Sequence, residues 1–93
     1  MASVTDIGSL ISQHPGVHGG RPCIAGTGVT VRRVAVLHNM GETPEEIAGD
    51  FGHLSLAQVH AALAYYYANK ADIDADLETE EHEYDLLAQQ DRH

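Results

Sequence analysis

The sequence predicts a small, mainly α-helical domain of the helix-turn-helix type, with a short N-terminal β-hairpin or strand pair and an extended, acidic C-terminal helical tail. Two observations carry this fold class: two helix-capping motifs stand close together mid-chain, and Gly and Pro crowd the segment before them. A 93-residue chain buries only about 60–65% of its unfolded surface, so we expect a single core. Twelve of its forty hydrophobic residues are Ala, which favours a thin helical core.

The first third of the chain is expected to hold only short β structure. Eight Gly and Pro residues break any helical period between positions 7 and 31. Two β-prone pieces, Cys23-Ile24 and Val29-Thr30-Val31, are separated by the Gly-containing residues 25–28. Because Gly supplies the backbone angles of tight turns, this pattern predicts a small hairpin or a pair of short strands.

A first helix is predicted over residues 31–40. Val31, Val34 and Leu37 follow a helical spacing, and Gly41 comes directly afterwards. Gly is the most frequent residue just beyond a helix C-terminus, so we expect the helix to stop there.

Two capping boxes then define a second and a third helix. Thr43 is followed by Pro44 and by Glu46 three residues on, which predicts a helix from Pro44 to about Phe51. Ser55 and Gln58 form the second box. No breaker follows them, so the third helix is expected to continue uninterrupted towards the end of the chain.

The second and third helices resemble a helix-turn-helix of the homeodomain-like or winged-helix-like kind. They are joined by the short Gly-containing link 52–54, which suits two helices docked at an open angle. A plain helical hairpin inside a small bundle explains the pattern equally well. In the first case the third helix would present Ser55, Ala57, Gln58 and His60 to DNA, and Gln58 is a residue type that pairs with an adenine edge. Arg32 and Arg33 would contact backbone phosphates, although a lone basic pair is more often a solvated helix start.

An apolar register runs along the third helix and into the tail. Leu56, Val59, Leu63, Tyr66, Ile73 and Leu77 recur at steps of three and four, with Lys70 as a gap, so we expect the body of this stripe to be buried. The net charge is −8 for residues 72–93 and −1 for residues 1–71. The chain is therefore divided into an N-terminal segment (1–18), a helix-turn-helix domain with short strands (19–71) and an acidic amphipathic tail (72–93), which alone should be weakly helical or disordered.

Several function classes are disfavoured by composition. The acidic charge excludes a generic nucleic-acid coat, because non-specific affinity for DNA comes from Lys and Arg. One cysteine permits no internal disulfide, and the absence of a signal peptide or apolar span in the sequence favours the cytoplasm. His14, His18 and Cys23 lack the paired spacings of a zinc site. A nucleophilic Cys23 would need a base and an orienting group inside a walled pocket, and a thin core offers little wall for one. We therefore expect neither an enzyme nor a cofactor.

An ordered series of motifs between Gly19 and Tyr67 carries a family likeness. It consists of Gly19-Gly20-Arg21-Pro22-Cys23-Ile24-Ala25-Gly26-Thr27, Val29-x-Val31, Gly41-x-Thr43-x-Glu45-Glu46-Ile47, Phe51-x-His53-Leu54-Ser55 and Val59-x-Ala61-Ala62-Leu63-Ala64-Tyr65-Tyr66. The series resembles the small prokaryotic family first catalogued as domain of unknown function 433. The chain departs from the family's pattern at Gly28, where Arg is usual, and at Thr30, where Pro is usual. The first change makes the loop less basic, and the second is expected only to loosen a strand start.

The resemblance implies an antitoxin of the VapB class. Such a protein is a homodimer that binds its own operator DNA through a helix-turn-helix and neutralises a PIN-like ribonuclease toxin through its C-terminal part. We expect the dimer to cover the apolar face of Leu56, Val59, Leu63 and Tyr66. We expect the toxin to bind the apolar stripe of the tail, which consists of Ile73, Leu77, Tyr84 and Leu87. Arg92 is expected to make an additional contact.

Two other functions stay open. A free-standing transcription regulator would use the tail only for solubility, and a small metal-binding or enzyme-accessory domain would use the His-rich loop. A ribonuclease-like reading frame beside the gene would favour the antitoxin.

Overall fold

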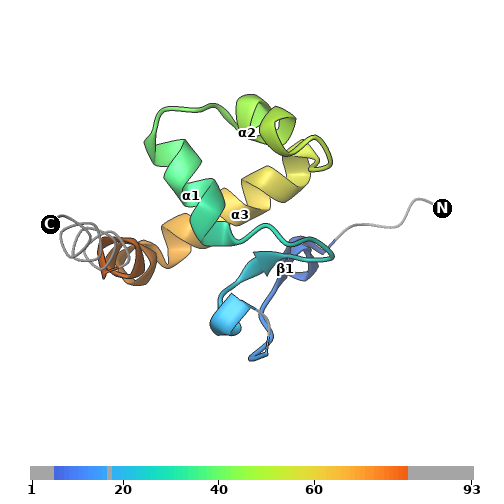
Figure 1. The fold of residues 1–93 in the computed structure, drawn as a ribbon. Coiled ribbons are helices and arrows are strands. Elements are labelled where there is room, and N and C mark those ends of the chain that lie inside the picture. Colours follow the sequence, from blue (N-terminus) through green and yellow to red (C-terminus); the bar gives the residue numbers. More distant parts are fainter. Residues whose placement is uncertain (1–5, 17, 80–93) are drawn as a thin grey trace, which may run out of the picture.

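The computed structural model describes residues 6–16 and 18–79, and it confirms the predicted fold class: a mainly helical domain with a short antiparallel strand pair at its N-terminal side. In chain order the elements are η1 (Ile7–Leu10), β1 (Ile11–Ser12), η2 (His18–Gly20), β2 (Cys23–Ile24), α1 (Val31–Asn39), α2 (Pro44–Phe51) and α3 (Leu56–Ala68). A further helical segment spans residues 70–79. Figure 1 shows α1, α2 and α3 surrounding a common centre, with the strand pair on one side. Within the described ranges no helix is long and apolar enough to cross a membrane.

The strand pair exists, but the main partner of Cys23-Ile24 is not the one the sequence suggested. Ile11 pairs with Ile24 and Ser12 with Cys23 in an antiparallel register. The expected Val29–Val31 strand is reduced to an isolated bridge between Cys23 and Thr30. Its extension is prevented because Val31 already begins α1.

Thr30 has a role that the sequence reading missed. Its hydroxyl accepts a hydrogen bond from the Arg33 N–H at 3.1 Å and thereby caps α1. Such a cap stabilises a helix by about 1 kcal/mol. A proline at this position would have no hydroxyl, so Thr30 supplies a side-chain cap as well as the strand start expected from the sequence.

The three helices form where local signals predict them. α1 ends at Asn39, with Met40 as its C-cap and Gly41 at a φ of 98°. Both capping boxes are present: Thr43 exchanges hydrogen bonds with Glu46, and Ser55 with Gln58. Gly52 ends α2 in the left-handed region at a φ of 74°, which a residue with a side chain rarely adopts.

The core lies between α1, α2, α3 and the second strand. Its most deeply buried side chains are Ile24, Val31, Val34, Ile47, Val59 and Tyr66. Leu56 is the exception in the predicted stripe, since it is 45% exposed at the first position of α3. The remaining stripe residues of α3, Val59, Leu63 and Tyr66, are covered within one chain, so they do not need a second copy. The argument that a dimer must cover this face is therefore wrong, and dimerisation itself stays a prediction.

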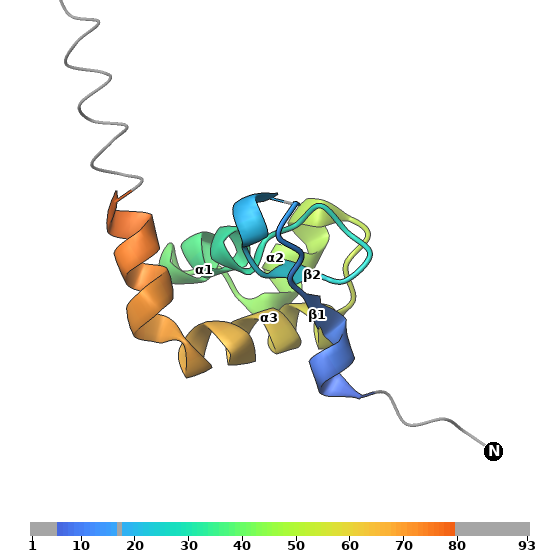
Figure 2. The same ribbon diagram turned by 90° about the horizontal axis from the view of Figure 1, so that it is seen from below.

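The uninterrupted third helix is also wrong. α3 ends at Ala68, and Asn69 adopts φ −126° and ψ 30°, outside the helical region. The Asn69 side chain donates a hydrogen bond to the Tyr65 carbonyl at 3.0 Å, and the Asn69 backbone N–H donates to the same carbonyl at 3.0 Å, so both groups hold Asn69 at the helix end. Figure 2 shows the segment 70–79 leaving the end of α3 at a steep angle.

The change of direction returns the start of the acidic tail to the body. Ile73 is only 9% exposed and belongs to the core cluster, and Leu77 packs against that cluster while half-buried. A straight continuation of α3 would carry both side chains away from the core. Burial of Ile73 thus helps to fix the bend at Asn69.

We predict that Ile73→Ala lowers the free energy of unfolding by about 2 kcal/mol, because it removes buried methyl groups and leaves a partial cavity. Leu56→Ala should cost less than about 1 kcal/mol, since Leu56 is half exposed. Urea unfolding followed by circular dichroism measures both. Equal stabilities of Ile73→Ala and the unaltered chain would show that the segment 70–79 is not part of the cooperative fold.

Candidate functional site

Two arginines from distant parts of the chain meet one carboxylate of the acidic segment. Arg21 directly precedes β2, Arg32 is the second residue of α1, and Asp76 lies in the segment 70–79. Oδ2 of Asp76 accepts hydrogen bonds from Arg21 Nε and from Arg32 Nη1, each at 3.1 Å. Arg21 Nη2 lies 3.5 Å from Oδ1. We call these three side chains the arginine–Asp76 cluster.

The cluster is accessible to solvent, and its two arginines lower the pKa of Asp76. The side chains of Arg21, Arg32 and Asp76 are 40%, 20% and 41% exposed. Hydrogen bonds from Arg21, and then the charges of Arg21 and Arg32, hold the pKa of the Asp76 carboxyl below its usual range. Asp76 is therefore ionised at neutral pH. Ion pairs this exposed contribute only about 0–1 kcal/mol each, so the contact can exchange with solvent or with another anion.

A second polar contact fixes the beginning of the same segment. Asp74 Oδ1 accepts a hydrogen bond from the Tyr66 hydroxyl at 2.6 Å, and Asp74 Oδ2 one from Lys70 Nζ at 2.7 Å. The Tyr66 oxygen also accepts one from Asn39 Nδ2 of α1 at 3.1 Å. The hydrogen bonds from Lys70 and then Tyr66 keep the pKa of the Asp74 carboxyl low. Asp74 and Asp76 thus attach the start of the tail to the body.

The residues predicted to read bases gather at the start of α3. Ser55, Ala57 and His60 are exposed there. Gln58 is half-buried, and its Oε1 accepts the Ser55 N–H at 2.8 Å within the capping box. A bidentate contact of Gln58 with adenine would compete with this capping hydrogen bond. In the structure the Gln58 side chain therefore caps α3.

The residues predicted to bind phosphate lie on a different helix. Arg32 takes part in the arginine–Asp76 cluster, whereas Arg33 is exposed at the third position of α1. The two arginines are adjacent in the sequence but have different surroundings, since Arg32 is paired with Asp76 and Arg33 is exposed.

Exposed acidic residues lie at both ends of α2. Glu45, Glu46 and Asp50 are exposed on α2. A hydrogen bond with the Asp50 side chain, then burial and the charges of Asp50 and Glu46, raise the pKa of the Glu42 carboxyl. This α2 face would repel a DNA backbone, so any operator contact must be made by α3 and the arginines.

The residues predicted to bind a toxin fall into two groups. Ile73 is in the core, and Leu77 packs against it, so both are used inside this chain. Tyr84, Leu87 and Arg92 lie outside the described residues. Of the four apolar residues in the predicted stripe, the first two, Ile73 and Leu77, therefore pack on the body of this chain.

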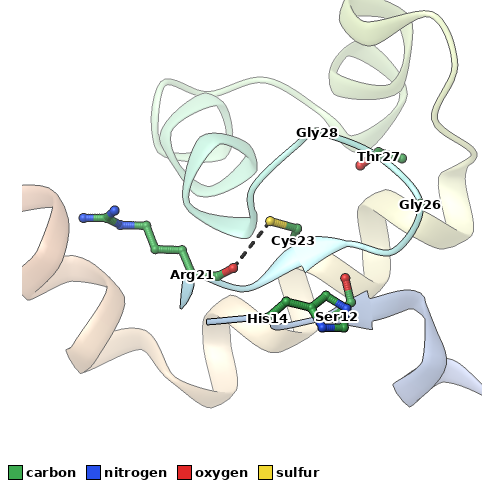
Figure 3. A pocket seen from close by; sticks show the side chains of 7 residues that line it. All are labelled: Ser12, His14, Arg21, Cys23, Gly26, Thr27 and Gly28. Atoms are coloured by element: carbon green, nitrogen blue, oxygen red, sulfur yellow. Dashed lines mark hydrogen bonds between the residues drawn. The ribbon is translucent and has the colours of Figure 1, made fainter. Parts of the chain in front are cut away.

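A hollow of about 270 Å³ lies beside the strand pair, lined by Ser12, His14, Arg21, Cys23, Gly26, Thr27 and Gly28 (Figure 3). Cys23 is buried, its thiol donates to the Arg21 carbonyl at 3.4 Å, and burial raises the pKa of that thiol. At neutral pH it is a protonated thiol and not the thiolate that acts as a nucleophile. In Figure 3 the Arg21 guanidinium points away from Cys23, towards the segment 70–79. The side chain of His18 lies outside the described part, and among the described residues no three His, Cys, Asp or Glu side chains gather as metal ligands would.

The structure thus defines a small helical domain in which a capped α2–turn–α3 unit, a strand pair and a docked acidic segment surround one core. Residues 11–66 match the family described as "Protein of unknown function (DUF433)", and the chain belongs to this family. It is also similar to the crystal structure of a DUF433 member protein from Anabaena variabilis, with 27% sequence identity and a TM-score of 0.70. That similarity covers 75% of this chain and 69% of the other. Among curated proteins, none matches the chain significantly in sequence.

Sequence reasoning missed the arginine–Asp76 cluster as a unit. Asp76 is separated from Arg21 by 55 positions and from Arg32 by 44, so no local spacing relates them. The only available signal was the general opposition between an acidic tail and a body that carries arginines.

We predict that acidification loosens the segment 70–79. The folded chain lowers the pKa of Asp76, so the contribution of this group is complete above its unperturbed pKa of about 4 and is lost as the pH falls through the lower, folded value. Its size should be about 1 kcal/mol or less, given the exposure of the cluster. The NMR signals of the Ile73 methyl groups, followed from pH 7 to pH 2.5, report the change.

Asp76→Asn should reduce the pH dependence of the Ile73 signals, and Asp72→Asn, in the same segment, should leave it unchanged. An identical titration of the unaltered chain and Asp76→Asn would contradict the assignment to Asp76.

Proposed function

We propose that this DUF433 protein is the antitoxin of a toxin–antitoxin pair. Its body binds operator DNA as a homodimer, and its acidic tail binds and neutralises a PIN-like ribonuclease toxin. The molecule works by binding, with no catalytic step and no cofactor. The observation that carries the proposal is the strong separation of charge along the chain, with −8 in residues 72–93 against −1 in the rest.

In this proposal the acidic tail has two parts with different uses. Asp74 and Asp76 make ion pairs within the chain, and Ile73 and Leu77 pack on the body. We assign to the toxin the acids and large apolar residues after Thr79, which lie outside the described residues, among them Glu80, Glu81, Tyr84 and Leu87. An acidic, amphipathic segment suits a groove with a basic rim, and a protein that binds RNA carries such a rim.

The α2–turn–α3 unit supports the operator-binding half of the proposal. Ser55 caps α3, and Ala57 and His60 are exposed near its start beside the half-exposed Leu56, so mainly small or polar side chains would enter a major groove. The acidic α2 face and the pairing of Arg32 with Asp76 predict weak binding for the full chain. Occupation of the tail by a toxin would relieve part of this repulsion.

An apolar groove supports self-association. It lies between η1, β1 and α3 and is lined mainly by Ile7, Ile11, Ala61, Ala64, Tyr65 and Ala68, of which Ile7 is 60% exposed. Small alanines on α3 allow a close approach by another surface. Sedimentation at micromolar concentration tests the dimer, and a monomer alone would end this part of the proposal.

The decisive experiment is co-expression with the product of the neighbouring gene. Replacing Tyr84 and Leu87 together by Ala should weaken inhibition of its ribonuclease activity by about tenfold or more, because buried apolar anchors dominate binding. Removing two acids instead, through Glu80→Gln with Glu83→Gln, should weaken it less and mainly through the association rate.

Three outcomes separate the alternatives. Full neutralisation by a chain ending at Thr79, which keeps the docked segment, would show that the body and not the distal tail holds the toxin. Absence of a ribonuclease partner together with operator binding would favour the free-standing regulator. Stoichiometric metal in the purified protein would favour the metal-binding accessory domain.

For the DNA-binding half, we predict that Ala57→Glu weakens binding of the protein to its own promoter about tenfold at low salt, because a new carboxylate would face the phosphates at the start of α3. Ala71→Glu is the matched control: it adds the same charge at an exposed position outside α3. Fluorescence anisotropy with a labelled duplex measures both affinities. Equal effects of the two substitutions would show that the start of α3 is not the contact surface.

A further inference from the structure

The arginine–Asp76 cluster has the geometry of an oxyanion-binding site. Counting these three side chains, two guanidinium groups face a single carboxylate, and both donate to the same oxygen atom at 3.1 Å. Arg21 presents Nε and Nη2 side by side to the two carboxylate oxygens. This side-on fork is the geometry in which arginine binds carboxylates and phosphates alike.

We infer that Arg21 and Arg32 together form a binding site for a phosphate group of nucleic acid, which Asp76 occupies in the uncomplexed chain. The inference deepens the proposed operator binding and rests on it for the source of the phosphate. A phosphodiester offers two non-bridging oxygens to the fork in the way the carboxylate does, and its full negative charge replaces that of Asp76.

The two arginines are anchored in the body, whereas their occupant comes from the docked segment. The residue after Arg21 is held by a hydrogen bond from the Val31 N–H to the Pro22 carbonyl at 3.0 Å, which joins the approach to β2 with the start of α1. Arg32 is itself on α1, and both arginines lie within residues 11–66 that match the family. Asp76 lies outside that range. The site therefore persists when its occupant leaves.

Exchange of the occupant does not require the core to open. Asp76 and Arg21 are each about two-fifths exposed, so an incoming phosphate reaches the cluster from solvent. Departure of Asp76 does remove one of the contacts that hold the segment 70–79, alongside Ile73 and the Asp74–Tyr66 hydrogen bond.

Occupation of the site and release of the segment are consequently linked. A phosphate on Arg21 and Arg32 favours the released segment, and a partner that draws the segment away favours phosphate binding by the same factor. Among the described residues, the Asp76 carboxylate is the group that a phosphate would replace on both arginines.

The test compares two full-length variants of equal charge. Asp76→Asn removes the occupant, and Asp72→Asn removes one negative charge from an exposed position four residues earlier on the same segment. Binding to a labelled 20-base-pair promoter duplex is measured by anisotropy at several salt concentrations. Asp76→Asn should bind at least about threefold more tightly than Asp72→Asn, and its plot of log affinity against log salt should be steeper by about one to two units, as expected for one or two additional phosphate contacts.

Adding Arg32→Gln to Asp76→Asn should return both quantities towards those of Asp72→Asn. Circular dichroism and the Ile73 methyl signals establish that the body of each variant is folded. Equal affinity and equal salt dependence of Asp76→Asn and Asp72→Asn would overturn the inference, while measurable binding by the unaltered chain would leave operator binding intact.

A titration with inorganic phosphate shows whether the site binds free phosphate and not nucleic acid. In Asp76→Asn, titration with phosphate should shift the NMR signals of Arg21 Nε, and less so in the unaltered chain. If these signals shift but no variant binds the duplex, operator binding fails, and the site belongs to free phosphate rather than to nucleic acid.

Discussion

The side chain of Tyr66 connects three helical segments, and the arrangement of the acidic residues depends on it. Its ring is buried in the core, while its hydroxyl donates to Asp74 and accepts from Asn39 of α1. A buried hydroxyl needs such partners, because a phenol left without them in the core costs about 1–3 kcal/mol. Satisfying Tyr66 thus draws the segment 70–79 against α1. Ile73 then completes the core, and Asp76 reaches the two arginines.

This arrangement gives acidic residues of one tail two physical roles. The proximal acids pair with nearby cations: Asp74 pairs with Lys70 of the same segment, and Asp76 pairs with Arg21 and Arg32 of the body. Each exposed ion pair is weak, so the apolar contact of Ile73 contributes most of the docking free energy. Docking of the segment therefore depends mainly on Ile73, whereas Asp76 makes its contact with the two arginines.

The match to the DUF433 family covers the body of this chain and not its acidic tail. The matching residues 11–66 include the strand pair, all three labelled α-helices up to Tyr66 and both arginines of the cluster. The acidic residues that distinguish the two halves of the chain come afterwards. In the proposed function the body binds DNA and the tail binds the toxin, and the contact of Asp76 with the arginines joins the two parts. The proposed antitoxin function uses both parts and their coupling.

The sequence by itself determined the helices. Thr43 and Glu46, or Ser55 and Gln58, satisfy one another across three positions, so composition and spacing were sufficient to place α2 and the start of α3. It also indicated the exposed candidates at the start of α3. Tertiary structure alone decided that Ile11-Ser12 pairs with Cys23-Ile24, that the helix breaks at Asn69 and that Asp76 meets Arg21. These contacts join residues distant in sequence, and their free energy comes from shared burial and charge pairing that no local spacing encodes.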